Sequence, residues 1–172
     1  MERFLSEIER RALVMAELAT GDREEALDIV QDAMFAFARR YASRPREEWP
    51  PLFHRILQNR IRDWYRRRHS RGRWWVRLGW QDDGETDTAD PIQQVADPDG
   101  RLPEQILMDE DDRARILAVL ERLPLRQQQA FLLRVWEGLD TAQTAHAMGC
   151  SEGSVKTHLA RARAMLQEQL AS

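Results

Sequence analysis

The sequence has very little of several things, and each shortage excludes a class of protein. Cysteine occurs once, at Cys150, so an intrachain disulfide and a cysteine-rich zinc site are both excluded. No apolar run approaches the roughly 18 residues that span a bilayer, and the first residues lack the apolar core of a signal peptide. We therefore expect a cytoplasmic protein without membrane insertion, in which Cys150 packs in a turn.

Catalytic patterns are also missing. The four histidines do not have the paired spacing of a metal site, and no nucleophile stands beside a base. One enzyme alternative rests on Asp109, Glu110, Asp111 and Asp112, which could be metal ligands of an exonuclease. Catalytic carboxylates of that kind come from separated elements, whereas four in a row point around a helix start. We expect no enzymatic activity, no metal, no cofactor and no small-molecule substrate.

The formal net charge of -3 hides two strongly charged segments. Residues 53–77 carry nine arginines against one aspartate, and residues 82–112 carry twelve acidic residues against one arginine. Nucleic-acid binding depends on the local field rather than on the total charge. The acidic balance of the whole chain is therefore no argument against a nucleic-acid partner.

Helical periodicity dominates the chain, and no segment has the alternation of a strand. Residues 3–19, 22–41 and about 52–69 carry apolar side chains at helical spacing, and the prolines of residues 43–51 separate the last two helices. Asp22 with Glu25 resembles a capping box. The inward positions are predicted to be Phe4, Ile8, Ala12, Met15 and Ala19; Ala26, Val30, Ala33 or Met34, Phe37 and Tyr41; and Phe53, Ile56, Leu57, Ile61 and Trp64.

The chain is therefore predicted to be all-α, with two small helical domains joined by an acidic flexible linker. Residues 1–78 form the first domain, with three helices. Residues 79–108 contain glycine, proline and aspartate but few large apolar side chains, which is typical of a linker. Residues 109–172 form the second domain.

The second domain contains a predicted helix-turn-helix. Asp140 with Gln143 begins one helix, Gly149 ends it, and Ser151 caps the next. Such a pair lays side chains of its second helix into the major groove of DNA, although plain helical bundles also contain it. In the second helix, the spacing predicts inward Val155, Leu159, Ala162 and Leu166 and outward Ser154, Lys156, Thr157, His158 and Arg161.

A polar stripe on the third helix consists of Arg55, Asn59, Arg62 and Arg66, at spacings of four, three and four. Guanidinium groups neutralise phosphates, and an amide reads base edges. Aromatic residues in or beside this basic segment suggest stacking on single-stranded or melted nucleic acid, with a solvated arginine face over core tryptophans as the alternative. These aromatic residues are Trp64, Tyr65, Trp74, Trp75 and Trp80.

A second polar face, on the helix predicted over residues 22–41, combines Asp28, Gln31, Asp32 and Phe35. An aromatic ring beside carboxylates can dock a basic partner helix, and an ordinary solvated face is equally compatible with the pattern.

Two sets of residues resemble the sigma factors of bacterial RNA polymerase. The segments Asp28–Met34 and Phe53–Trp64, with the run Arg66–Arg68, resemble sigma region two. Further residues resemble sigma region four: Leu123, Pro124, Arg126, Gln127, Phe131–Arg134, Glu137–Leu139, Gly149, Cys150 and Gly153–Thr157. Two such domains and nothing else resemble the extracytoplasmic-function sigma factors.

The resemblance implies a role for each face. The face with Asp28, Gln31, Asp32 and Phe35 would contact core RNA polymerase. The stripe with Arg55, Asn59, Arg62 and Arg66 would bind the minus 10 element of promoter DNA. The residues Ser154, Lys156, Thr157, His158 and Arg161 would read the minus 35 element. The acidic linker would cross the polymerase interior or act as a plain spacer, and an anti-sigma factor is a further possible partner.

The main alternative function is a stand-alone helix-turn-helix regulator that does not act through polymerase, because residues 151–159 also resemble the output domain of response regulators. That alternative leaves the first predicted domain without a role. We therefore expect a transcription-initiation factor that binds core polymerase and directs it to specific promoters.

Overall fold

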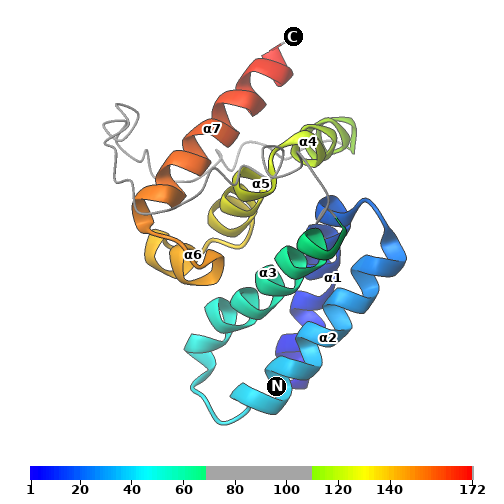
Figure 1. Cartoon of the computed structure of the whole chain (residues 1–172), viewed down its shortest axis with the longest axis vertical. Coiled ribbons are helices and arrows are strands. Elements are labelled where there is room, and N and C mark those ends of the chain that lie inside the picture. The colour runs from blue at the N-terminus through cyan, green and yellow to red at the C-terminus, as the bar shows by residue number, and fades with distance from the viewer. Residues whose placement is uncertain (69–109, 172) are drawn as a thin grey trace.

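The structure, a computed structural model, describes residues 1–68 and 110–171. Helices make up nearly all of these two ranges, and neither range contains a strand (Figure 1). This confirms the predicted all-α class. The predicted linker, residues 79–108, lies outside the described residues, as do Trp74, Trp75 and Trp80.

The first three helices form an N-terminal unit, with α1 at Glu2–Thr20, α2 at Arg23–Tyr41 and α3 at Trp49–Arg68. The short 3-10 helix Arg46–Glu48 precedes α3. The prolines were expected to delay the start of α3 to about residue 52, and this was wrong. Pro50 and Pro51 occupy its first turn, where no intrahelical donor is needed and the fixed proline φ suits a helix.

The core of this unit is aromatic at one end. Phe4, Phe37, Trp49 and Phe53 stand with ring centroids 5.5 to 6.2 Å apart, in tilted and edge-to-face arrangements. All four side chains are buried. Aromatic pairs at such distances stabilise a core beyond the burial of their area. The predicted inward stripes of α1 and α2 are buried except at Tyr41, which is half-buried, and Ala33 rather than Met34 is the fully buried alternative.

The remaining helices form a C-terminal unit. They are α4 at Glu110–Arg122, α5 at Leu125–Phe131, α6 at Thr141–Met148 and α7 at Glu152–Ala171. A π-helical turn, Leu132–Trp136, continues α5. Gly138 then reverses the chain with a φ of 70°, a conformation that glycine adopts at low steric cost.

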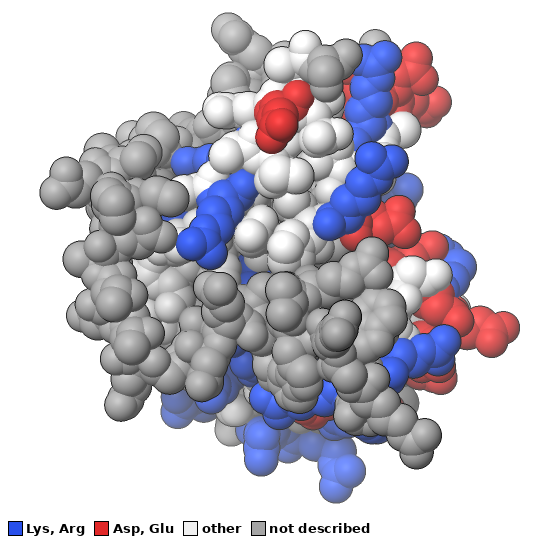
Figure 2. All heavy atoms as spheres, turned by 45° about the horizontal axis from the view of Figure 1, so that its top comes forward, with Lys and Arg blue, Asp and Glu red and all other residues white. Residues whose placement is uncertain are grey.

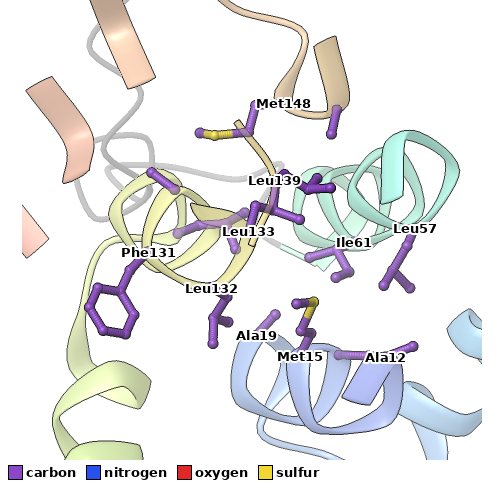
Figure 3. Close-up of a cluster of buried hydrophobic side chains, with 14 of the residues drawn as sticks. Ala12, Met15, Ala19, Leu57, Ile61, Phe131, Leu132, Leu133, Leu139 and Met148 are labelled. Atoms are coloured by element: carbon purple, nitrogen blue, oxygen red, sulfur yellow. The ribbon is translucent and has the colours of Figure 1, made fainter. Parts of the chain in front are cut away.

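The two units pack against each other and share one hydrophobic core. Figure 3 shows Ala12, Met15, Leu57 and Ile61 of the N-terminal unit beside apolar side chains of the C-terminal unit. The partners labelled there on the C-terminal side are Phe131, Leu132, Leu133, Leu139 and Met148. In Figure 1, α6 lies next to α3, while the C-terminal end of α7 points away from the N-terminal unit.

Among the described helices, none combines the length and the apolar character that a bilayer span requires.

Candidate nucleic-acid interface

The helix-turn-helix forms as the sequence predicts, because side chains cap both of its helices. The Asp140 carboxylate accepts a hydrogen bond from the Gln143 backbone at 2.7 Å, and the Gln143 amide oxygen accepts from the Asp140 backbone at 3.0 Å. Gly149 ends α6 in the left-handed conformation, with a φ of 66°. The Ser151 hydroxyl then accepts from the Ser154 backbone at 3.1 Å at the start of α7. These contacts set where α6 begins and ends and where α7 begins.

The outer face of α7 agrees with the prediction except at one position. Lys156 and Arg161 are exposed, and Ser154 and Thr157 are half-buried. His158, predicted to point outward, is buried, with only 6% of its surface exposed. The reason is that α7 packs against α4, α5 and α6, so its buried sector is wider than one apolar stripe.

The polar stripe of α3 is not the free surface that its periodicity suggested. Three of its four members are half-buried against the C-terminal end of α6. The Arg55 guanidinium donates to the His146 carbonyl oxygen at 2.6 Å, and the Arg62 guanidinium donates to the Met148 carbonyl oxygen at 2.8 Å. Arg62 also donates to the Asn59 side-chain oxygen. These carbonyls lie at the C-terminal end of α6, where the helix dipole favours cations.

Arg66, the fourth member, is exposed and lies 3.9 Å from the Asp63 carboxylate. The basic residues that follow Arg68 are outside the described ranges.

Two guanidinium groups converge on one carbonyl at this contact. Arg126, at the start of α5, is buried and donates to the Met148 carbonyl oxygen at 2.7 Å. Burial, followed by the charge of Arg126, lowers the pKa of Arg62 to about 10. Arg62 stays charged near neutral pH, but it is held beside a second cation. Burial and the charge of Arg55 likewise lower the pKa of His146 below its ordinary value.

A carboxylate also lies in the contact between the N-terminal and C-terminal units. This contact, in which α1 and α3 face α5, α6 and the turn between them, is called the seam below. The Glu137 side chain is 4% exposed and accepts from Arg11 Nε at 2.9 Å and from His54 Nε2 at 3.2 Å. Burial alone would raise the pKa of Glu137, but the hydrogen bonds and charges of His54 and Arg11 outweigh it, and the pKa is lowered. Glu137 is therefore ionised at neutral pH and joins α1 and α3 to the turn before α6.

Trp64 belongs to the core rather than to a stacking platform. The residue is 9% exposed, and its ring packs edge-to-face on Tyr65 and donates from Nε1 to the Glu25 carboxylate at 3.1 Å. Glu25 had been expected to complete a capping box with Asp22. The Asp22 carboxylate does cap α2, accepting from the Glu24 and Glu25 backbones, but the Glu25 side chain turns to Trp64 instead.

The polar face of α2 is open, as predicted. Asp28, Gln31 and Asp32 are exposed, and Phe35 is 70% exposed, more than any other large apolar side chain of the described residues. Asp32 lies 3.8 Å from Arg60 of α3. A ring this exposed beside carboxylates leaves apolar area that a partner surface can cover.

Charge is distributed unevenly over the surface as well. In Figure 2, basic side chains form the lower edge of the visible face and flank its upper part, while acidic side chains gather along one side. Within residues 1–68 and 110–171, no group of three or more histidine, cysteine or acidic side chains is placed to hold a metal ion.

Sequence reasoning did not assign a role to the residues that join the two units, Arg11, His54, Arg126, Gln128 and Glu137. One signal was available. His54 and Gln58 lie beside the apolar positions Phe53, Leu57 and Ile61, so the buried part of α3 is too wide for contact with α1 and α2 alone.

The sequence of the C-terminal unit matches a known family. Residues 113–166 match the family described as Sigma-70, region 4. The chain is 32% identical over 164 residues to the RNA polymerase sigma-E factor of Streptomyces coelicolor, an alignment that covers 86% of this chain and 85% of that protein. The chain belongs to the extracytoplasmic-function sigma factors of RNA polymerase.

Two further comparisons agree with this family. The extracytoplasmic-function RNA polymerase sigma factor SigM of Mycobacterium tuberculosis is 29% identical over 157 residues, which cover 91% of this chain and 69% of that protein. The sigma factor RpoE of Bartonella quintana, solved in complex with the anti-sigma factor NepR, superposes with a TM-score of 0.62 at 22% identity. That match covers 99% of this chain and 96% of the other, and it shows that the fold is shared. The chain is therefore a transcription-initiation factor rather than a stand-alone regulator.

Proposed function

We propose that this sigma factor binds core RNA polymerase through the open face of α2 and recognises promoters through two separate DNA-binding faces. The observation that carries the proposal is the capped helix-turn-helix of α6 and α7, which coincides with the residues that match sigma region four. It holds exposed Lys156 and Arg161 on the outer side of the second helix.

The contact with core polymerase is assigned to Asp28, Gln31, Asp32 and Phe35. Support comes from the exposure of all four side chains and from the combination of two carboxylates with one apolar ring. Such a patch suits a basic amphipathic partner surface, where the ring supplies buried area and the carboxylates supply orientation.

The minus 35 element is assigned to Ser154, Lys156, Thr157 and Arg161. His158 is kept only as a residue that positions α7, because its side chain is buried. The minus 10 element is assigned to Arg55, Asn59, Arg62 and Arg66 on α3. Guanidinium groups and one amide on a single helix face suit a strand whose bases have left the stack.

We further infer that residues 1–78 act as the polymerase and minus 10 domain, residues 79–108 as the linker, and residues 109–172 as the minus 35 domain. The protein performs no covalent chemistry in this scheme and acts in the cytoplasm, where its polymerase works. An anti-sigma factor is a proposed partner, supported by the shared fold of RpoE, which was solved with NepR.

Two assays separate the DNA-binding roles. Lys156→Ala or Arg161→Ala should weaken binding of the holoenzyme to double-stranded promoter DNA by at least about fivefold, because a lost base contact costs roughly 1–3 kcal/mol. Asn59→Ala should leave that binding unchanged and reduce open-complex formation, measured by permanganate reactivity of melted thymines. Gln167→Ala, at an exposed position near the end of α7, is the control. Equal defects of the three variants in both assays would sink this division of roles.

A further inference from the structure

The polar side of α3 and the C-terminal end of α6 form hydrogen bonds with each other. Arg55 and Arg62 extend across the seam between the two units and donate hydrogen bonds to the His146 and Met148 carbonyl oxygens, at 2.6 and 2.8 Å respectively. The fit is close, because a Cβ at Gly149 would lie 3.3 Å from both terminal nitrogens of Arg62. These two guanidinium groups are therefore occupied as long as α6 stays in place.

The chemistry at this contact is the chemistry of a nucleic-acid contact. The last carbonyls of a helix have no partner within the helix and carry its partial negative charge. Guanidinium groups that would pair with phosphate or base oxygens pair here with those carbonyls. The end of α6 thus presents to α3 the kind of oxygen acceptor that a DNA strand would present.

We propose that the chain, when free of polymerase, closes on itself, with the C-terminal end of α6 occupying the DNA-binding groups of α3. This rests on the proposed function, which assigns Arg55, Asn59 and Arg62 to the minus 10 element. Promoter melting in this scheme requires that α6 first leaves α3, so the two DNA-binding faces are not available at once in the free protein.

Further contacts hold the closed arrangement. Glu137 bridges Arg11 of α1 and His54 of α3, and the Gln128 side chain donates to the Leu18 carbonyl oxygen of α1 at 3.3 Å. His54 Nδ1 is buried and has no hydrogen-bond partner among the described residues, while Nε2 of the same ring lies 3.2 Å from the Glu137 carboxylate.

Apolar packing fills the space between these polar contacts. Met15 and Ile61 of the N-terminal unit lie beside Leu132, Leu133 and Leu139 of the C-terminal unit, and four of the five side chains are 2% exposed or less (Figure 3). Opening the seam would expose this cluster to water, which opposes spontaneous separation.

The first test measures the accessibility of the arginines in the full chain. Phenylglyoxal modifies free guanidinium groups, and mass spectrometry gives the rate at each arginine. We expect Arg55 and Arg62 of the free protein to react at least about fivefold more slowly than exposed Arg60, because their reaction requires local opening. Equal rates at the three positions would overturn the proposal.

The second test opens the seam from its edge. Arg11→Glu places a second carboxylate beside buried Glu137, while Arg10→Glu makes the same charge change at an exposed neighbouring position. Energy transfer between dyes on Arg39→Cys and Gln167→Cys, in a Cys150→Ser background, reports the separation of the units. We expect a fall in transfer and fast modification of Arg62 with Arg11→Glu only.

Glu137→Gln keeps the shape of the side chain, removes its charge and should act in the same direction, so the test does not depend on one variant folding. Helical circular dichroism unchanged from the parent chain establishes that each variant is folded. Low transfer and fast modification of Arg62 already in the parent chain, unchanged in the Arg11 and Arg10 variants, would contradict the closed arrangement.

Run-off transcription with core polymerase separates this inference from the proposed function. A closed chain that supports promoter-specific transcription agrees with both. An open chain that supports transcription overturns the inference alone, and a closed chain that never supports transcription overturns the proposed function.

Discussion

Two polar helix faces of the N-terminal unit differ in how much of their surface is free. The face of α2 with Asp28, Asp32 and Phe35 is exposed, whereas the face of α3 with Arg55 and Arg62 lies under the end of α6. The covered face of α3 is even the more polar of the two, because the open face of α2 includes Phe35. Polarity alone therefore does not tell a free surface from a surface that is covered by another part of the chain. If the proposed roles hold, the proposed polymerase face of α2 is accessible in the free protein before the proposed DNA-binding face of α3.

The contact that covers α3 can be destabilised by a substitution in its apolar cluster. We expect this change to have the largest effect on stability. Leu133 is fully buried in the cluster between the units. Leu133→Ala should lower the free energy of unfolding by about 2–5 kcal/mol, because it removes buried methyl groups and leaves a cavity. Urea denaturation followed by circular dichroism measures the loss. Leu170→Ala, at an exposed position of α7, should change it by less than about 0.5 kcal/mol.

The open side can be broken by reversing its charge. Asp28→Arg or Asp32→Arg should reduce the affinity for core polymerase by at least about tenfold, since hot-spot changes at interfaces cost roughly 2 kcal/mol or more. The fold should survive, because both side chains are exposed. Fluorescence anisotropy with labelled protein measures the affinity, and Glu9→Arg on α1 is a control with the same charge change. Unchanged affinity in both variants would remove this face from the proposed polymerase contact.

The helix that covers α3, α6, can be destabilised at its N-terminal end. Asp140→Ala removes the carboxylate that accepts from the Gln143 backbone, and the loss of such a cap costs about 1 kcal/mol. Thermal unfolding should show a lower Tm. Asp140→Asn retains an oxygen acceptor and should preserve most of the stability; a loss as large as that of the alanine variant would mean that the contact is not a cap.

Acidic pH should weaken the contact between the two units, with a smaller effect than the substitutions above. His146 has a lowered pKa in the folded chain. Its contribution to the stability of the closed arrangement is therefore present above about pH 6.5 and is lost as the pH falls below that value. Glu137 also has a lowered pKa, so its contribution is lost at more acidic pH, below about 4.5. Energy transfer between the units should therefore fall in two steps on acidification. His146→Gln should remove the upper step and keep the lower one.

Most of the helices and their inner faces could be predicted from the sequence, because helix periodicity and capping are local properties. The buried stripe of α1, the Asp140 cap and the left-handed Gly149 are examples. The covered state of Arg55 and Arg62 could not be predicted, because it depends on packing between segments far apart in the chain. His158 was assigned outward for the same reason: its burial follows from three neighbouring helices rather than from its own spacing.

The most direct test of the central claim is run-off transcription with purified bacterial core polymerase on genomic fragments that include the region upstream of the gene, with and without this protein. The account predicts discrete transcripts that appear only when the protein is added and that disappear with Asp32→Arg. Binding of the fragments by the protein alone, with no transcript in the presence of core polymerase, would contradict it.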